Sequence, residues 1–427
     1  MSAAVKGEFL GHPKGLFVLF FTELWERFSF YGMKALLILY MLNYLVWNQV
    51  SASNVMAWYA GLVYCTPVLG GLLADKLLGA RWTVLFGGIL IAIGHFLLAF
   101  EPLPFFYSGL GFLIAGVGML KPNISTQVGS LYHPDDARRD SAFTIFYMGI
   151  NIGALLGPIV CGRLMEHPRF GFHYGFAAAG VGMVIGLIVY VLGMRSVVRR
   201  VALVVAESED SPAAQSETAN QGVEPRRETP SHVYRDRIIV LLLIFVFAVI
   251  FWMAFEQAAN VMTIWADKHT NLYPFRSAAP EVVIEGATET APAETTSWRD
   301  FRVTAPELLT VNPFFIITLA AVFAWFWIWL EKRKLQPSTP AKLVLGFLGM
   351  TLAYGVMILA AQSENRPTSA PLAKLPEGVV LEDYGATRLH YDEQSRTLRM
   401  NGVLTDLDWL RVLGDSAPES YRQTIDT

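Results

Sequence analysis

The sequence predicts an all-α protein that crosses a membrane many times. Of its 427 residues, 53% are hydrophobic and only 16% are charged, whereas about a quarter of the residues in soluble domains are charged. The apolar residues are also grouped in long runs, and about 20 apolar residues suffice for a helix that spans a bilayer. These two observations exclude a soluble enzyme and a disordered protein. The net charge of −3 argues against nucleic-acid binding.

Nine apolar runs are long enough to be spanning helices. They are Gly15–Leu45, Val55–Ala74, Trp82–Phe100, Pro104–Leu120, Ser141–Cys161, Gly175–Met194, Ile238–Trp265, Pro313–Leu330 and Ala341–Ala361. With the N-terminus inside, most of the loop lysines and arginines lie inside, as the positive-inside rule requires. We therefore expect a multi-pass protein of the inner (plasma) membrane with a cytoplasmic N-terminus. Because the number of spans is odd, the C-terminal segment is expected outside.

The spans fall into two blocks separated by polar sequence. Residues 1–195 predict a six-helix bundle, residues 196–237 a mostly disordered cytoplasmic linker, and residues 238–362 the first three helices of a second bundle. Such a division is typical of transporters in which two bundles rock about a midplane site. The incomplete second bundle favours a fragment that lacks its last spans, with a natural end at Thr427 as the alternative.

Residues 363–427 predict a soluble exterior segment. Thr387–Met400 alternates like a β-hairpin, with its turn at Asp392–Ser395. Leu404–Leu413 predicts a short amphipathic helix. Between spans seven and eight, Asp267–Thr310 predicts an exterior loop.

Span one carries four ionisable residues, and such residues within a span indicate a functional site. Glu23, Arg27 and Lys34 share one broad helix face, and Glu26 lies beside them. Arg27 can neutralise one carboxylate, so one negative charge is left over. A surplus carboxylate in a low-dielectric site takes up a proton near neutral pH, which favours a proton relay. A static salt bridge to a neighbouring helix is the alternative.

Two further charges lie within or at the end of spans. Lys121 closes span four and precedes Pro122, so we expect the helix to bend there and turn the lysine into a cavity. A lysine that extends to the cytoplasmic surface is the alternative. Glu256 lies well inside span seven, and Lys34 is a cation at a suitable depth to pair with it. His95 in span three is expected to be a hydrogen-bonded core residue rather than a proton carrier.

Four separate motifs resemble those of one known family. They are Phe20–Lys34 with its core Glu-x-x-Glu-Arg-Phe, Gly70–Arg81, Phe143–Gly153, and Phe251–Gln257 together with Asn312–Pro313. Over about residues 10–361 the chain resembles the proton-dependent oligopeptide transporters, the peptide branch of the major facilitator superfamily. The resemblance implies the major facilitator fold, with an N-terminal six-helix bundle and an incomplete C-terminal one.

The resemblance also implies a role for each matching residue. Glu23, Glu26, Arg27 and Glu256 would take part in proton coupling. Lys34 and Glu256 would pair as an exterior gate, where lysine makes a weaker contact than the arginine common in the family. The residues that match substrate-binding positions are Lys34, Tyr31, Tyr64, Lys121, Asn151, Trp252 and Asn312.

Several positions depart from the family pattern or allow a second interpretation. Phe30 stands where many members have a second tyrosine, so one pocket hydroxyl is lost. Ala57 stands near the place where vertebrate members have a histidine. Helices ten to twelve, with the helix-ten glutamate, are missing, and residues 363–427 fall where vertebrate members have an exterior domain. Asp75 and Arg81 match an interior gate of the superfamily, although glycine and aspartate there can equally form a tight turn.

The sequence thus predicts symport of di- and tripeptides with protons by alternating access. The proton gradient would drive transport without a cofactor or metal, and the monomer would contact a peptide and the lipid bilayer but no nucleic acid. A related carrier of nitrate or another small solute is one alternative, and a truncated peptide-binding protein without transport is another. An enzyme is not expected, because no nucleophile–base set, phosphate loop or metal-ligand spacing is found. The charged run from Asp135 to Arg139 is expected to be a solvated loop.

Overall fold

The structure is a computed structural model. It describes residues 8–133, 135–209, 231–269, 303–335, 337–364, 367–371, 389–392 and 397–401. The chain divides into two compact units, of which the first comprises Met1–Asn260 and Leu309–Ala324 and the second Val261–Leu308 and Trp325–Thr427. The candidate site lies within the first unit.

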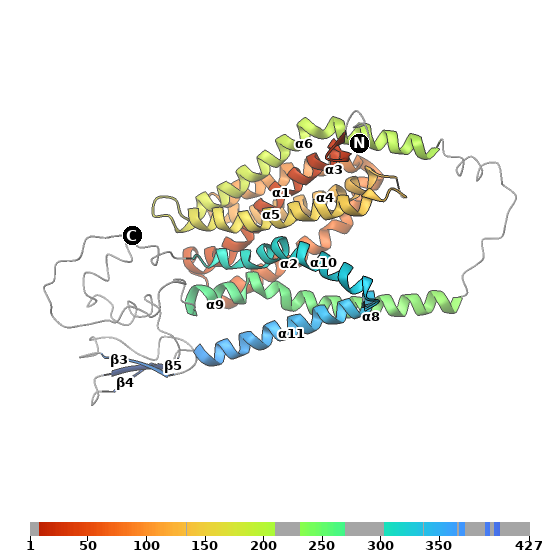
Figure 1. Ribbon diagram of the computed structural model, residues 1–427. Coiled ribbons are helices and arrows are strands. Elements are labelled where there is room, and N and C mark those ends of the chain that lie inside the picture. Colours follow the sequence, from red (N-terminus) through yellow and green to blue (C-terminus); the bar gives the residue numbers. More distant parts are fainter. Residues whose placement is uncertain are drawn as a thin grey trace. The chain divides into compact units, whose positions relative to one another are not determined.

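The first unit is a helical bundle preceded by a short hairpin (Figure 1). The hairpin consists of β1 (Glu8–Phe9) and β2 (His12–Pro13), and α1 (Lys14–Leu39) follows at once and ends in a π-helical turn, Tyr40–Tyr44. The other elements are α2 (Gln49–Leu73) with a π-helical turn at Ala74–Leu78, α3 (Ala80–Leu98), α4 (Leu103–Ser130), α5 (Arg138–Glu166), α6 (Gly171–Glu209) and α8 (Ser231–Phe255).

Helix α1 is the core of this bundle, and it packs against α5 and α6, while α4 packs against α2 and α3. Glycines allow α1 and α5 to approach closely. A Cβ atom at Gly153 or Gly157 would collide with the backbone of Leu24 or Phe28 on α1. Small residues serve this purpose in membrane bundles, where close van der Waals packing replaces the hydrophobic effect between helices.

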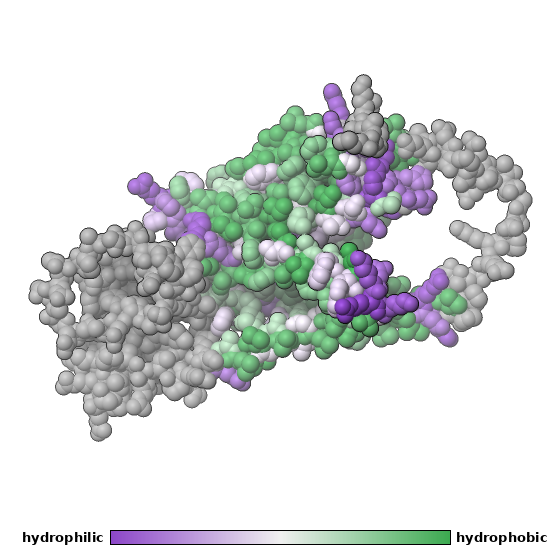
Figure 2. Space-filling view, viewed as in Figure 1, coloured by the Kyte–Doolittle hydropathy of each residue, from purple (hydrophilic) through white to green (hydrophobic). Residues whose placement is uncertain are grey.

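Eight helices of the described residues are long and apolar enough to cross a membrane. They correspond to the second through ninth predicted spans. The first predicted span, α1, is a helix of 26 residues, and it is set apart from the eight by its four ionisable residues. Along the face of the first unit seen in Figure 2, hydrophobic residues cover the helices and hydrophilic residues gather at helix ends, which is the distribution that a bilayer requires.

The described residues correct three details of the sequence analysis. Helix α6 continues to Glu209 and α8 begins at Ser231, so both ends of the predicted disordered linker are helical, and residues 210–230 lie outside the described residues. The seventh span is found over Arg235–Asp267, but it is not one uninterrupted α-helix. A 3₁₀ turn at Glu256–Ala259 and a non-helical Asn260 separate α8 from α9 (Val261–His269). The end of span four at Lys121 is also wrong, because α4 runs through Pro122 to Ser130.

The second unit contains α9 and the later part of the chain. A 3₁₀ turn, Pro306–Thr310, leads into α10 (Val311–Lys332), which begins in the first unit, and α11 (Thr339–Glu364) follows. A three-stranded antiparallel sheet has the order β3 (Pro367–Pro371), β5 (Thr397–Asn401), β4 (Leu389–Asp392).

The pairing of β4 with β5 joins Asp392 to Thr397 and Leu389 to Met400. It confirms that the two predicted strands pair, while residues 393–396 of the predicted turn lie outside the described residues; β3 was not expected. The predicted helix at Leu404–Leu413 lies outside the described residues, as do residues 270–302 of the predicted exterior loop.

Candidate functional site

The middle of α1 holds a buried cluster of three charges. The side chains of Glu23, Glu26 and Arg27 are each at most 3% exposed. Arg27 Nη2 donates to Glu26 Oε1 at 2.6 Å, and Arg27 Nε pairs with Glu26 Oε2 and, at 3.2 Å, with Glu23 Oε1. One guanidinium therefore serves two carboxylates, as the helical spacing predicts.

The cluster has one more negative than positive charge, and it is incompletely hydrogen-bonded. Glu23 Oε2 is buried and has no hydrogen-bond partner among the described residues. An unpaired charge away from water is costly, and a single added proton would neutralise the cluster. This arrangement fits a proton relay, but the choice between a relay and a static salt bridge stays a prediction.

A second charged group joins α1, α2 and the end of α8. Lys34 Nζ lies 2.6 Å from Glu256 Oε2, and the Tyr64 hydroxyl donates to Glu256 Oε1 at 2.8 Å. The predicted pairing of Lys34 with Glu256 is confirmed, while its role as a gate stays a prediction. Each carboxylate oxygen of Glu256 therefore accepts from a different donor, Oε2 from Lys34 and Oε1 from Tyr64.

The position of Glu256 follows from the break between α8 and α9. Glu256 is the first residue of the 3₁₀ turn that ends α8. Beyond the turn, Ser53 Oγ on α2 donates to Asn260 Oδ1 at 3.0 Å. Short 3₁₀ segments within helices often mark functional hinges, and this one lies between the contacts with Tyr64 and Ser53.

Lys121 lies beside Tyr64. Its Nζ is 5.2 Å from the centroid of the Tyr64 ring, within the range of a cation–π interaction. Because α4 continues to Ser130, Lys121 is an interior residue of the helix and not its last one. Trp252 on α8 extends the same group, with its ring 6.3 Å from that of Tyr64.

The remaining predicted binding residues are less closely connected. Tyr31 is half-buried, and its ring meets that of Phe30 edge-on at 5.4 Å. Asn151 is buried, and its amide donates to the Tyr147 carbonyl of its own helix at 2.8 Å. Asn312 is exposed in the first turn of α10. The contacts of the described residues thus bring together Lys34, Tyr64, Lys121, Trp252 and Glu256, and they do not join Asn151 or Asn312 to this group.

The predicted interior gate is an exposed turn. Asp75 lies in the π-helical turn after α2, and Gly79 follows with a φ of 74°. The Arg81 guanidinium lies 5.4 Å from the Trp82 ring centroid. No ion pair joins Asp75 to Arg81 within the described residues. The left-handed glycine is typical of a tight turn, and the gating role stays a prediction.

His95 corrects one expectation. It is fully buried in α3, as predicted, but neither ring nitrogen has a hydrogen-bond partner among the described residues. The expectation that His95 is a core residue is therefore confirmed, whereas the expectation that it is hydrogen-bonded is wrong.

Sequence comparison assigns this bundle to a family. A family model described as the POT family matches residues 81–202. An uncharacterized transporter of Bacillus subtilis, YclF, is 33% identical over 412 aligned residues, which cover 85% of this chain and 77% of the relative. The chain belongs to the POT family.

Two further relatives of the POT chain have names that state a substrate. The peptide transporter YePEPT of Yersinia enterocolitica is 33% identical and is matched over 83% of this chain and 75% of its own length. A di-/tripeptide transporter of Lactococcus lactis is 30% identical, with 82% of this chain and 76% of the relative covered.

Solved structures of POT transporters share the fold. A crystal structure of a POT family transporter in complex with a thioalcohol-conjugated peptide has a TM-score of 0.66 and 29% identity, covering 84% of this chain and 78% of that one. A peptide transporter POT in complex with sulfate has a TM-score of 0.60 and 31% identity, covering 82% and 75%. The fold is therefore that of an all-α polytopic membrane protein of the major facilitator superfamily, as the sequence predicts.

Within this POT chain, the sequence analysis did not predict that the Phe30 ring lies beside both Arg27 and Lys34. The Arg27 guanidinium lies 4.9 Å and the Lys34 ammonium 5.8 Å from the centroid of the Phe30 ring. The ring is 8% exposed, so two like charges share one buried aromatic surface. The spacing was the available signal, because residues 27, 30 and 34 are three and four apart on one helix face.

Proposed function

We propose that this POT protein carries di- and tripeptides across a cell membrane together with protons. The names of the Yersinia and Lactococcus relatives support the substrate class. The observation that carries the proposal is the pair of charged groups on α1. The first group, Glu23, Glu26 and Arg27, has one surplus negative charge that a single proton would neutralise. The second group joins Lys34 on α1 to Glu256 at the end of α8.

The proposed coupling uses the two contacts of Glu256. A protonated Glu256 would no longer form an ion pair with Lys34, and the end of α8 would be held less firmly against α1. Protonation would thus shift the population between a closed and an open arrangement of these helices. The Glu23, Glu26 and Arg27 cluster would act as the second proton acceptor on the same helix.

The proposed binding group is cationic and aromatic. Lys121 and Lys34 would attract the carboxylate of a peptide, and Tyr64 and Trp252 would form walls that tolerate different side chains.

The energy would come from the proton gradient alone, without a cofactor. We place the protein in the plasma membrane as a monomer, with its N-terminus and the α4–α5 turn at the cytoplasmic side and the strands β3, β4 and β5 outside. The turn that contains Asp75, with Arg81 just after it, would gate the interior.

Uptake into liposomes tests this proposal. The purified protein is reconstituted, and uptake of labelled dialanine is measured with an inward proton gradient, with the gradient collapsed by an ionophore, and by counterflow without a gradient. Gradient-driven uptake that is abolished by the ionophore is expected. Excess nitrate should not compete, whereas other dipeptides should. Binding without uptake or counterflow would instead identify a peptide-binding protein that does not transport.

The coupling residues are tested by separating the two uptake modes. Glu26→Gln is expected to abolish gradient-driven uptake while counterflow persists, because counterflow needs no net proton movement. Asp135→Asn is a matched control that removes a carboxylate with 93% side-chain exposure. If Glu26→Gln leaves gradient-driven uptake intact, or abolishes counterflow as well, the coupling role assigned to Glu26 is wrong.

A further inference from the structure

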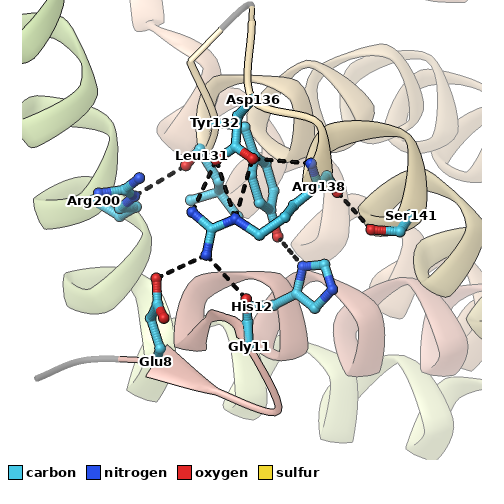
Figure 3. Close-up of polar contacts among 9 residues, drawn as sticks. All are labelled: Glu8, Gly11, His12, Leu131, Tyr132, Asp136, Arg138, Ser141 and Arg200. Atoms are coloured by element: carbon cyan, nitrogen blue, oxygen red, sulfur yellow. Dashed lines mark hydrogen bonds and ion pairs between the residues drawn. The ribbon is translucent and has the colours of Figure 1, made fainter. Parts of the chain in front are cut away.

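The first described residues of the chain are attached to a distant turn by polar contacts (Figure 3). Arg138, the first residue of α5, donates from Nη1 to Glu8 Oε1 and to the Gly11 carbonyl, each at 3.0 Å. His12 Nδ1 lies 2.8 Å from the Tyr132 hydroxyl. The hairpin formed by residues 8–13 is thus attached to the α4–α5 turn at both of its strands.

Arg138 is itself held in place on the α4–α5 turn. Its Nε and Nη2 donate to the Asp136 carboxylate at 3.1 Å and 2.8 Å, and its backbone N–H donates to the same carboxylate at 2.9 Å. The Arg138 guanidinium keeps the pKa of the Asp136 carboxyl below its usual value, so this pair is ionised at physiological pH. The expected solvated loop holds for Asp135, whose side chain is 93% exposed, but Asp136 and Arg138 take part in a network of polar contacts that reaches Glu8.

Helix α6 reaches the same place. Arg200 Nε donates to the Leu131 carbonyl at 3.0 Å, and a Cβ at Gly15 would lie 3.1 Å from Leu131 Cδ2 and 3.2 Å from Val197 Cα. The start of α1, the α4–α5 turn and the extension of α6 therefore meet at one end of the six-helix bundle.

The hairpin is partly exposed: polar contacts attach it to the α4–α5 turn, and the Phe9 ring meets that of Phe17 on α1 edge-on at 4.9 Å. Leu10 at its turn is 76% exposed and has a φ of 50°, and Phe9 is 54% exposed. A positive φ is unfavourable for leucine, so the turn depends on contacts elsewhere. The Glu8 and Arg138 side chains are 23% and 41% exposed, and salt weakens ion pairs that water reaches. The attachment is therefore one that can open without unfolding the bundle.

We propose that residues 8–13 form a detachable latch that joins the start of α1 to the α4–α5 turn, with Arg138 as its anchor. The latch precedes α1 without an intervening loop, and α1 is an uninterrupted helix from Lys14 to Leu39. A helix transmits a tilt of its first turn along its length, so the latch acts on the position of the α1 charges relative to α4. Arg138 is in this sense a positioning residue.

The consequence for transport rests on the proposed function. With the latch closed, α1, the α4–α5 turn and α6 move as one body when the bundle rocks. With the latch open, the first turn of α1 can move relative to the α4–α5 turn, while the middle of α1 stays packed against α5 and α6, and the charge cluster is positioned less firmly relative to α4. Opening the latch should therefore lower the maximal rate of uptake and leave the KM for the peptide unchanged.

Hydrogen–deuterium exchange tests the latch without reference to transport. Glu8→Gln and Arg138→Gln are expected to raise amide exchange in residues 131–136 and in the first turn of α1, by about 2- to 5-fold for a partly exposed ion pair. Added salt should do the same in the unaltered protein. Because both side chains form one contact, the double variant should exchange no faster than Arg138→Gln alone. Additive effects would overturn the pairing, and exchange that none of these changes alters would overturn the latch.

Uptake kinetics in liposomes then test the coupling to transport. Glu8→Gln should lower the maximal rate of dialanine uptake by about 2- to 5-fold at constant KM, and Glu8→Asp should restore part of it. Asp135→Asn, on the same turn but outside the latch, is the matched control. A raised KM, or a rate that is unchanged although exchange has risen, would overturn the positioning role. If the unaltered protein shows no uptake, the proposed function fails, and the exchange data still decide on the latch.

Discussion

The close approach of α1 and α5 can be tested with a single added methyl group. In Gly157→Ala, the new Cβ would lie 2.9 Å from Gly32 N, 3.1 Å from the Phe28 carbonyl carbon and closer still to the Phe28 carbonyl oxygen. These are backbone atoms, which no rotamer change can move away. Ordinary contact between non-bonded heavy atoms begins near 3.5 Å, so the helices would have to separate by about 0.5 to 1 Å.

The magnitude follows from a comparison with a glycine that has open space. At Gly61 on α2, a Cβ would meet nothing within 4 Å. Gly61→Ala should therefore gain only helix propensity, about 1 kcal/mol. Gly157→Ala gains the same propensity, so the difference between the two variants isolates the collision, which we expect to cost about 1 to 3 kcal/mol.

Thermal unfolding followed by tryptophan fluorescence measures this difference in detergent. The melting temperature of Gly157→Ala should lie below that of Gly61→Ala by about 2 to 4 °C for each kcal/mol. Uptake should fall as well, because Phe28 adjoins Arg27 and a shift of α1 displaces the charge cluster. Equal melting temperatures of the two variants would refute the close packing and, with it, the position of α1 relative to α5.

Three further predictions follow from single contacts. Phe30→Leu removes the ring between two cations, where a desolvated cation–π contact stabilises by about 2 kcal/mol; it should change the pH profile of dialanine uptake, whereas Phe28→Leu, on the same helix, should not. Asn123→Leu removes an amide that donates to the Gly70 carbonyl at 3.1 Å, and it should lower stability by about 0.6 to 1.7 kcal/mol in thermal unfolding. The pKa of Asp136 is lowered in the folded state from 3.8, so the stability it contributes is complete above that value and is lost as pH falls towards the folded-state pKa. Exchange of the α4–α5 turn, corrected for intrinsic rates, should rise as the pH falls below 3.8, and exchange that does not change there would contradict the assignment.

Sequence patterns were a good guide to the helices and to one long-range contact. The lengths of the apolar runs predicted where the spans lie, because a bilayer requires a minimum length of apolar helix. The pairing of Lys34 with Glu256 was predictable because two opposite charges within spans must find partners. The same rules failed at helix ends. Polar residues do not stop a helix that continues into water, which is why α6 extends to Glu209 beyond the predicted span.

Other features depended on contacts that no local pattern reveals. The span rule places Glu256 inside one continuous helix, whereas the structure puts it at the start of a 3₁₀ turn with Tyr64 as a second donor. The run from Asp135 to Arg139 has the composition of a solvated loop, and only the position of the hairpin shows that Arg138 binds Glu8.

The sequence by itself determined that this protein is a helical membrane protein, that it belongs with the POT transporters, and that two glutamates and one arginine lie within five residues of its first span. Each of these depends on composition, run length or spacing within one helix, and such properties are local. The tertiary structure alone decided which donor each carboxylate of the site receives and which segments meet at the latch. Those outcomes depend on how close two helices can pack, and at Gly153 and Gly157 that distance is set by the absence of a side chain.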